Sequence, residues 1–292
     1  MRFEGVYTAL VTPFTKSKAI DEVALKELVD FQIDNGVAGL VPMGTTGESP
    51  TVDIDENIRV IEVVVEQTDG RIPVIAGTGS NSTNEAIEMT KVAAEIGADA
   101  SLQIAPYYNK PTSEGFYRHF ATIADCSDLP LIIYNIASRT GKNIDNDTML
   151  RIASIPTVCG VKEASGSMAQ VTDLIMRKPE TLDILSGDDN LTLPIIALGG
   201  RGVISVASNL IPKEMTELVS AAVAGQIEKA QEIHYRLLPF FQAIFLETNP
   251  IPIKAALAEA GKIAETYRLP MCPMSKPLRK NLVDVMKQLK LT

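Results

Sequence analysis

The chain has 292 residues, of which 46% are hydrophobic and 22% charged, a composition typical of a globular protein with a large core rather than of a disordered chain. Its formal net charge of −9 and the lack of any Lys/Arg cluster exclude nucleic acid as an expected partner. No apolar run reaches the roughly 18 residues of a membrane span, and MRFEGVYTAL at the start lacks the features of a signal peptide, so we expect a cytoplasmic protein without membrane partners.

Eight short apolar runs follow one another along the chain, with helical segments between them. Their centres lie about 28 residues apart on average, enough for one strand, one helix and two loops. This alternation predicts parallel strands. The runs are VYTALVT, VAGLVP, IPVIAG, ASLQIA, LPLIIYN, VCGVK, LDILSG and GVISV.

Segment 82–97 illustrates the helices expected between the runs. Ser82 and Glu85 have the spacing of a capping box, and Gly97 suits the C-terminal cap. Ala86, Met89, Ala93 and Ile96 recur at helical spacing. We therefore expect this stripe to pack on the sheet.

Eight consecutive βα units with strands apolar on both faces predict a closed (β/α)8 TIM barrel rather than a doubly wound sheet. We assign residues 1–225 to a barrel domain and 226–292 to a C-terminal α-helical domain. The second region shows helical patterns at 227–246, 253–260 and 277–289, broken by NPIPI and LPMCP.

Reacting groups of such barrels project from the carboxyl ends of the strands. The sixth run ends in Lys162, which by strand alternation shares a face with Gly160 and Val158, while Glu163 points toward the helices. If that face points inward, low dielectric lowers the lysine pKa and supplies a neutral amine for a Schiff base. The alternative is a surface lysine or half of a structural ion pair.

Three further candidates lie beside other strand ends. Tyr134 ends the fifth run and is either a proton donor beside the lysine or a core aromatic. GTTGES at 44–49 follows the second run and offers hydroxyls to a carboxylate, although Thr45 and Glu48 also fit a capping box. Arg139 is either a carboxylate clamp or a solvated loop residue.

Metal and cofactor chemistry find little support in the sequence. Asp188 and Asp189 suggest an acid/base or magnesium site, but a helix N-cap is the favoured interpretation. The three cysteines are far apart and are expected to be reduced thiols, and two histidines are too few for a typical catalytic zinc site. We expect no metal and no external cofactor.

A set of motifs resembles the dihydrodipicolinate synthase family of class I aldolases, in order and spacing, over essentially the whole chain. The motifs are GTTGES at 44–49, APYYNKP at 105–111, YNIASRTG at 134–141, GVKEASG at 160–166, SGDD at 186–189, GGRGVISV at 199–206 and NPIPIK at 249–254.

The resemblance implies a reaction in which Lys162 forms an imine with pyruvate and the enamine attacks L-aspartate 4-semialdehyde. The product would be 4-hydroxy-tetrahydrodipicolinate, on the diaminopimelate route to L-lysine. Tyr134, Thr45 and Tyr108 would relay protons, with Tyr108 entering from a neighbouring subunit of a homotetramer built as a dimer of dimers. Thr46 would hold the pyruvate carboxylate, Arg139 the second carboxylate, and the backbone near Gly187 and Ile204 would line the pocket.

The resemblance also implies a lysine feedback site at the dimer interface, formed by Ser49, Asn81, Glu85 and Tyr107. Ile54 and Asn57 stand where sensitive members often carry histidines, so weak inhibition is expected. Ala137 stands where the family usually has a proline. This difference bears on the stiffness of the loop rather than on the chemistry.

Two other functions stay open at this point. A relative with the same imine lysine, such as N-acetylneuraminate lyase or a keto-deoxy sugar acid aldolase, would need polar partners for a polyol instead of an arginine clamp. A keto-acid-binding barrel without activity is the non-enzymatic alternative, because a fold alone does not establish chemistry.

Overall fold

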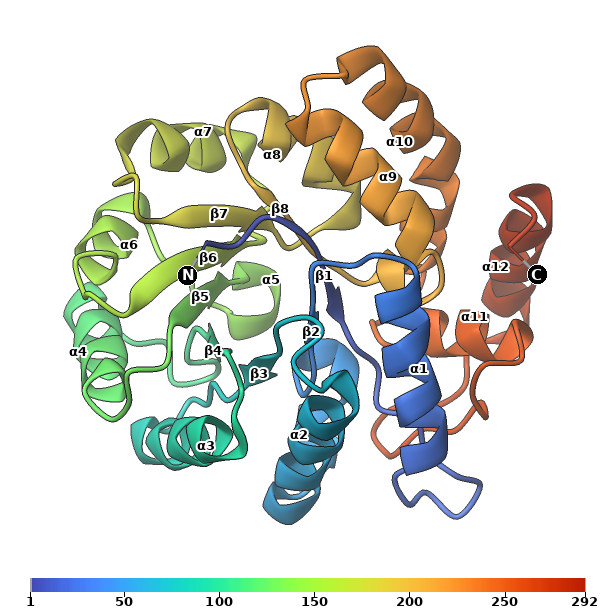
Figure 1. Ribbon diagram of the computed structural model, residues 1–292, viewed down its shortest axis with the longest axis horizontal. Helices are drawn as coiled ribbons and strands as arrows, with labels where there is room; N and C mark the ends of the chain where they lie inside the picture. The colour runs from blue at the N-terminus through green and yellow to red at the C-terminus, as the bar shows by residue number, and fades with distance from the viewer. Residues whose placement is uncertain (1, 292) are drawn as a thin grey trace.

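The computed structural model describes residues 2–291, in which eight parallel strands alternate with helices around a barrel (Figure 1). One strand coincides with each of the eight apolar runs, within a residue at the start of the first and at the end of the sixth, which confirms the prediction. The strands are β1 (Gly5–Ala9), β2 (Gly39–Val41), β3 (Ile75–Gly77), β4 (Ala100–Ile104), β5 (Leu131–Asn135), β6 (Val158–Glu163), β7 (Asp183–Ser186) and β8 (Gly202–Ser205).

The strands form an almost closed cylinder. Their order is β2-β1-β8-β7-β6-β5-β4-β3, so the first and last strands in the chain are neighbours, with Tyr7 opposite Ile204. Between β2 and β3 a single parallel bridge joins Leu40 to Val74, supported by a 3.0 Å bond from the Leu40 N–H to the Pro73 carbonyl. The TIM barrel is therefore confirmed.

Helices cover the outside of the barrel (Figure 1). The α-helices are α1 (Glu22–Asp34), α2 (Ile54–Thr68), α3 (Thr83–Ile96), α4 (Ser113–Ala124), α5 (Ala137–Thr140), α6 (Asn146–Ile152), α7 (Met168–Arg177), α8 (Thr192–Ala197), α9 (Pro212–Val223), α10 (Ile227–Ala243), α11 (Ile251–Glu259) and α12 (Lys276–Gln288). Short 3-10 turns are η1 (Thr45–Gly47), η2 (Ser49–Thr51), η3 (Asp189–Leu191) and η4 (Ala207–Asn209). No helix within residues 2–291 is long and apolar enough to cross a membrane.

Helix α3 begins and ends as its sequence predicts, with one difference. The Ser82 side chain accepts from the Glu85 N–H, and Gly97 ends the helix at φ 97°. The prediction of the reciprocal bond of the capping box is wrong, because the Glu85 carboxylate accepts from Ser80 Oγ at 2.8 Å instead of from the Ser82 backbone N–H. The intervening Ser80 hydroxyl in turn accepts from the Ser82 N–H at 3.1 Å.

Strand β6 carries an irregularity that changes which residues face inward. Leu131 pairs with Val158 but Ile132 pairs with Gly160, so Cys159 is an extra residue without a partner on β5. Val158 consequently belongs to the outer core, and the prediction that it shares a face with Lys162 is wrong. Gly160 does face inward, where an added Cβ would lie 3.4 Å from Ile132.

The three C-terminal helices form where the sequence pattern placed them. Helix α10 packs along α9 and α12, and α12 also packs on α11; in Figure 1, α11 and α12 lie on the side of the barrel away from α4 and α6. Their apolar residues share one hydrophobic core with α1, α2 and α9. The division of the chain at 225/226 into two domains stays a prediction.

Candidate active site

Lys162 lies inside the barrel at the carboxyl end of β6. Its side chain is buried, with 5% of the residue exposed, and it stands directly opposite Tyr134 of β5 in the sheet register. Burial lowers the pKa of Lys162 to about 8, although the charges of Asp188 and Asp189 act in the opposite direction. The sequence argument for an inward lysine is consistent with this placement.

The phenol of Tyr134 completes a close pair with this lysine. The Nζ atom of Lys162 lies 4.1 Å from the centroid of the Tyr134 ring. Burial raises the pKa of Tyr134, while the nearby Arg139 and the Thr45 side chain favour the ionised form. The phenol therefore stays protonated near neutral pH and can donate a proton to a group beside Lys162.

Gly187 and Ile204 line the interior around the lysine. A Cβ built on Gly187 would lie 2.7 Å from the Cβ of Ala164 and 3.3 Å from the Cε of Lys162, so only glycine fits without displacement. Ile204 is fully buried and belongs to the same interior cluster as Tyr134. Gly187 therefore lies beside the lysine side chain and Ile204 lies in the barrel interior, and their predicted roles at the substrate stay predictions.

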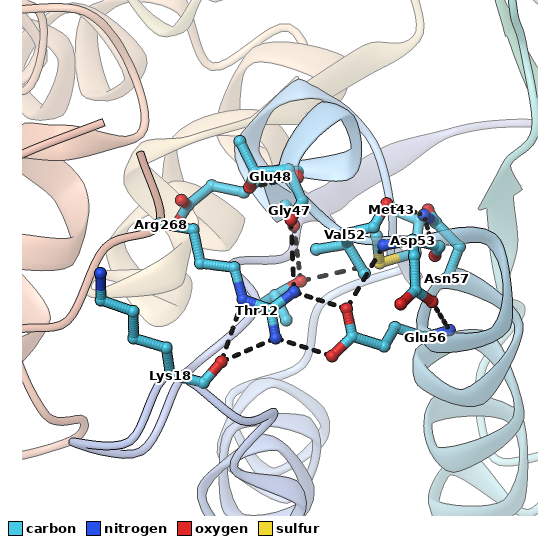
Figure 2. Close-up of polar contacts among 11 residues, drawn as sticks. Thr12, Lys18, Met43, Gly47, Glu48, Val52, Asp53, Glu56, Asn57 and Arg268 are labelled. Atoms are coloured by element: carbon cyan, nitrogen blue, oxygen red, sulfur yellow. Dashed lines mark hydrogen bonds and ion pairs between the residues drawn. The ribbon is translucent and has the colours of Figure 1, made fainter. Parts of the chain in front are cut away.

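The GTTGES segment forms two consecutive 3-10 turns with Glu48 between them. Glu48 has φ 57°, and its N–H bonds the Thr45 carbonyl at 3.1 Å. The Thr12 hydroxyl donates to the Gly47 carbonyl at 2.7 Å (Figure 2). The alternative of a Thr45–Glu48 capping box is wrong, because the Glu48 carboxylate instead accepts from Lys254 inside the protein.

The two threonines of this turn have different surroundings. Thr45 lies at the wall of the cavity described below. Thr46 is buried, and its hydroxyl accepts a 3.0 Å bond from Asn249 Nδ2. A hydroxyl held in this way keeps its own proton free to donate to an acceptor such as a carboxylate.

A cavity of about 470 Å³ is lined by three of the candidate catalytic and substrate-binding residues, Thr45, Tyr134 and Arg139. Lys162 does not line this cavity and lies against the Tyr134 ring that does. Arg139 belongs to the four-residue helix α5, which begins at Ala137. Its Nη2 donates to the Asn249 carbonyl at 3.0 Å, which anchors the guanidinium on one side, and the residue lines the cavity.

Asp189, the second residue of the acidic pair after β7, has a structural role that differs from the predicted helix N-cap. Asp189 is buried and accepts from the Ser205 hydroxyl at 2.5 Å and from the N–H groups of Val206 and Ala207 at 3.1 and 2.9 Å. Burial raises the pKa of Asp189 to about 6. Neither side chain caps its own turn, so the N-cap interpretation is wrong. Asp189 instead holds the end of β8.

Tyr108 is the one predicted relay residue that this chain does not bring to its own lysine. Its side chain is 89% exposed, and its backbone is left-handed at φ 68°. The neighbouring Tyr107 turns the other way and lines the cavity. An exposed tyrosine on a fixed loop is available to a second subunit.

Three of the four residues of the predicted lysine site line the same cavity. Ser49, Glu85 and Tyr107 line it, and Asn81 donates to the Tyr107 carbonyl at 3.3 Å. Asn57 also lines the cavity, but its amide donates to the carbonyls of Val52 and Asp53 at 2.9 and 2.8 Å. Within residues 2–291, no three His, Cys, Asp or Glu side chains gather closely enough to hold a metal ion.

Sequence reasoning missed the role of the NPIPIK segment in building the site. Asn249 contacts both Thr46 and Arg139, and Lys254 bonds Glu48. One signal was available: Lys254 is a charged residue within the otherwise apolar run IPIKAALA, which predicts a buried cation with a partner. The identity of that partner, 206 positions away, was not readable from the pattern.

Comparisons with known proteins agree over the full chain. The model of the Dihydrodipicolinate synthetase family matches residues 2–289. A 4-hydroxy-tetrahydrodipicolinate synthase from Thermodesulfovibrio yellowstonii is 51% identical over 285 residues, 98% of each chain. A dihydrodipicolinate synthase structure from Aquifex aeolicus is 46% identical with a TM-score of 0.97 over 99% of both chains. A structure described as the first monomeric dihydrodipicolinate synthase variant is 42% identical, with a TM-score of 0.97 over 99% of this chain and 98% of its own.

Proposed function

The chain belongs to the dihydrodipicolinate synthetase family, and we propose that it is a 4-hydroxy-tetrahydrodipicolinate synthase, a lyase of the pyruvate aldolase type. Its substrates are pyruvate and L-aspartate 4-semialdehyde, and its product enters the diaminopimelate route to L-lysine. The observation that carries the proposal is the buried Lys162 amine, 4.1 Å from the Tyr134 ring and walled by Gly187.

The reaction begins with attack of the neutral Lys162 amine on the ketone carbon of pyruvate. With a pKa of about 8, roughly a tenth of the amine is unprotonated at pH 7. Loss of water leaves an imine, which accepts the electron pair released when the pyruvate methyl group loses a proton. The resulting enamine attacks the aldehyde carbon of the second substrate. This bond formation restores the imine to Lys162, and the amine of the second substrate then attacks the imine carbon, closes the ring and releases the Lys162 amine.

Proton transfers in this sequence are assigned to Tyr134, Thr45 and Tyr108. Tyr134 is supported by its position over Lys162 and by burial, which keeps its phenol protonated until a partner removes the proton. Thr45 shares the cavity wall with Tyr134 and hydrogen-bonds its phenol. Tyr108 would complete the relay from a neighbouring subunit, in keeping with its exposure.

Two groups are assigned to the substrate carboxylates. Thr46, oriented by Asn249, would hold the carboxylate of bound pyruvate together with the backbone near Gly187 and Ile204. Arg139 would bind the carboxylate of aspartate semialdehyde, with its guanidinium anchored on the Asn249 carbonyl. Thr46 and Arg139 both bond Asn249, so this one residue sets the distance between the two carboxylate-binding groups.

A homo-oligomer follows from the assignment of Tyr108, with a dimer of dimers as the proposed assembly. The exposed Tyr108 supports it, whereas a relative described as a monomeric variant indicates that the fold alone does not require association. The cytoplasmic location and the absence of an external cofactor stay predictions.

The imine is tested by borohydride reduction in the presence of pyruvate. We expect one covalent adduct per chain, on the peptide that carries Lys162, because borohydride reduces an imine irreversibly. The control is Lys162→Ala, which should take up no label. Label that is absent from the wild type, or equal in the variant, would contradict the proposed chemistry.

The second substrate is tested by comparing turnover of aspartate semialdehyde with turnover of N-acetylneuraminate. The anchored Arg139 favours the short, charged aldehyde, so Arg139→Ala should raise the KM for aspartate semialdehyde while leaving pyruvate trapping intact. Faster turnover of the sugar acid would identify the chain as a lyase of the same superfamily instead.

Feedback by lysine is expected to be weak. Ile54 presents no polar atom from its side chain, and both amide hydrogens of Asn57 are occupied by backbone carbonyls, so a bound lysine finds few donors there. A titration of the activity with L-lysine should show little inhibition below millimolar concentration. Strong inhibition at micromolar concentration would overturn this prediction.

A further inference from the structure

One ion pair in the described part of the chain has both side chains fully buried. Lys254 Nζ donates to Glu48 Oε1, and the two side chains are 0% and 1% exposed. Every other ion pair between residues 2 and 291 includes a partner whose side chain is partly exposed to solvent. The pair therefore stands apart from the surface salt bridges.

Two aromatic rings and the charge of Arg268 lie near the Lys254 amine, in addition to Glu48. The Nζ atom lies 4.2 Å from the centroid of the Phe14 ring and 5.4 Å from that of Tyr267. Burial lowers the pKa of Lys254, and the charge of Glu48 opposes that shift. Such a pair adds little net stability, because its attraction is offset by the cost of desolvating both charges. A well-packed apolar pair would stabilise the fold as well.

The position of Glu48 links the pair to the reacting groups. Glu48 separates the turns η1 and η2, with its N–H bonded to the Thr45 carbonyl and its own carbonyl accepting from the Thr51 N–H at 2.9 Å. Its left-handed backbone at φ 57° is sterically unfavourable for a glutamate and has to be held by other contacts. Moving Glu48 would consequently tilt the turn that presents Thr45 and Thr46.

Helix α11 delivers two contacts to this turn from one rigid element. Asn249, just before the helix, donates to the Thr46 hydroxyl, and Lys254, in its first two turns, bonds Glu48. The Lys254 N–H bonds the Pro250 carbonyl at 3.0 Å, so both residues belong to one hydrogen-bonded segment. The turn is thus held at two of its residues, Thr46 and Glu48.

Arg268 fixes the far side of the same segment. Its guanidinium contacts both oxygens of Glu56 and the carbonyl of Lys18 (Figure 2), and it also donates to the Thr51 carbonyl at 3.2 Å. The contact with Thr51 lies at the end of η2, three residues after Glu48. The C-terminal region therefore contacts this part of the chain at two places: Lys254 bonds Glu48 in the interior, and Arg268 bonds Thr51 at the end of η2.

We propose that Glu48 and Lys254 are positioning residues for the reaction: their pair locks α11 against the GTTGES turn and thereby aims Thr45 and Thr46 at the substrate held on Lys162. The inference rests on the proposed function, since it gives those threonines their roles. A loosened turn affects the pyruvate carboxylate contact of Thr46 and the proton transfer through Thr45. The lysine amine, on the separate strand β6, keeps its own surroundings.

The test is the double variant Glu48→Gln/Lys254→Met, which removes both charges and keeps the volume of each side chain. We expect a thermal midpoint within a few degrees of the wild type, a rise in the KM for pyruvate and a fall in kcat of about tenfold or more. Borohydride with saturating pyruvate should still label Lys162 completely.

The matched control is Asp183→Asn at the start of β7, at the opposite end of the barrel. It weakens the buried carboxylate that accepts from the Phe3 N–H and pairs with Arg2, so the thermal midpoint should fall while kcat is unchanged below it. A double variant with wild-type kcat and KM would overturn the inference. Wild-type protein that takes up no label would instead contradict the proposed function.

A milder variant covers the case in which the double variant does not fold. Glu48→Gln/Lys254→Gln leaves two neutral amides that can still hydrogen-bond to each other, so no buried charge loses its partner, while the shorter side chain at position 254 reduces the reach. A fall in kcat of about threefold, with complete labelling of Lys162, is expected from partial misplacement of the turn. An unchanged kcat in this variant would also overturn the inference.

Discussion

Lys162 reacts only while its amine is unprotonated, so its surroundings set the pH at which the enzyme works. Burial brings the pKa down to about 8 from the 10.5 of an ordinary lysine, and two aspartates limit the shift. The residue therefore retains a proton below about pH 8 and is largely neutral above it. The charged form is the one that burial destabilises.

The rate of imine formation at low pyruvate concentration should rise with pH and level off above about pH 8. Asp188→Asn should move the midpoint of that profile to lower pH, because the charge of Asp188 raises the lysine pKa. The measurement is the initial rate of borohydride-trapped adduct between pH 6 and 10, a range chosen to bracket that midpoint. A midpoint near 10.5 would show that the amine is not desolvated.

Gly187 has no room for a side chain beside the lysine. The Cβ of Gly187→Ala would press on Ala164 and on the Lys162 Cε, so we expect a loss of kcat/KM of about a hundredfold. Gly261→Ala is the control: its Cβ meets nothing within 4 Å, but its φ of 70° carries strain, so it should lose stability and keep its activity. Equal activity in both variants would contradict the steric argument.

At the scale of elements, Asp189 ties the turn after β7 to the end of β8. Asp189→Asn exchanges one acceptor oxygen for a donor in a buried site with three donors, and should lower the stability by about 1–3 kcal/mol. Asp188→Asn serves as the control, because the Asp188 side chain makes no cap bond to its turn. Denaturant unfolding of the two variants measures the difference, and equal losses would refute this role.

The elements were predictable because each depends on local patterns. Short apolar runs gave the eight strands, and the N-cap Ser82 and the terminal Gly97 gave the ends of α3. The irregularity at Cys159 was not predictable, because alternation assumes a regular strand and the extra residue depends on pairing with β5. The hydrogen-bond partner of the Glu85 side chain was mispredicted for a similar reason, because Ser80, in the loop before α3, donates to that carboxylate.

The site was predictable where a residue's position in its strand determines its direction, as for Lys162 and Tyr134. Contacts between distant segments were not predictable, because nothing near Glu48 in the sequence indicates Lys254. The GTTGES pattern indicated hydroxyls for a carboxylate, but the motif resemblance was needed to assign that role to Thr46 and to give Tyr108 any role. Those roles stay predictions until variants are measured.

At the scale of the whole molecule, Tyr108 predicts that activity depends on association. Lys162→Ala and Tyr108→Phe chains, each inactive alone, should regain activity when mixed under conditions that allow exchange. One site of a mixed dimer then receives both intact residues, so up to about half of the activity of those dimers returns. If exchange is demonstrated and nothing returns, Tyr108 acts within its own chain or has no part in the reaction.

The bond between Lys254 and Glu48 also has a consequence for the order in which the chain matures. A ribosome that adds about 5–20 residues per second exposes the barrel strands and Lys162 before α11, because β8 ends at Ser205 and α11 begins only at Ile251. A nascent chain can thus form most of the cylinder while the GTTGES turn still lacks its inner anchor. The growing polypeptide would carry its reactive amine early and become a competent catalyst only when its last segment is released.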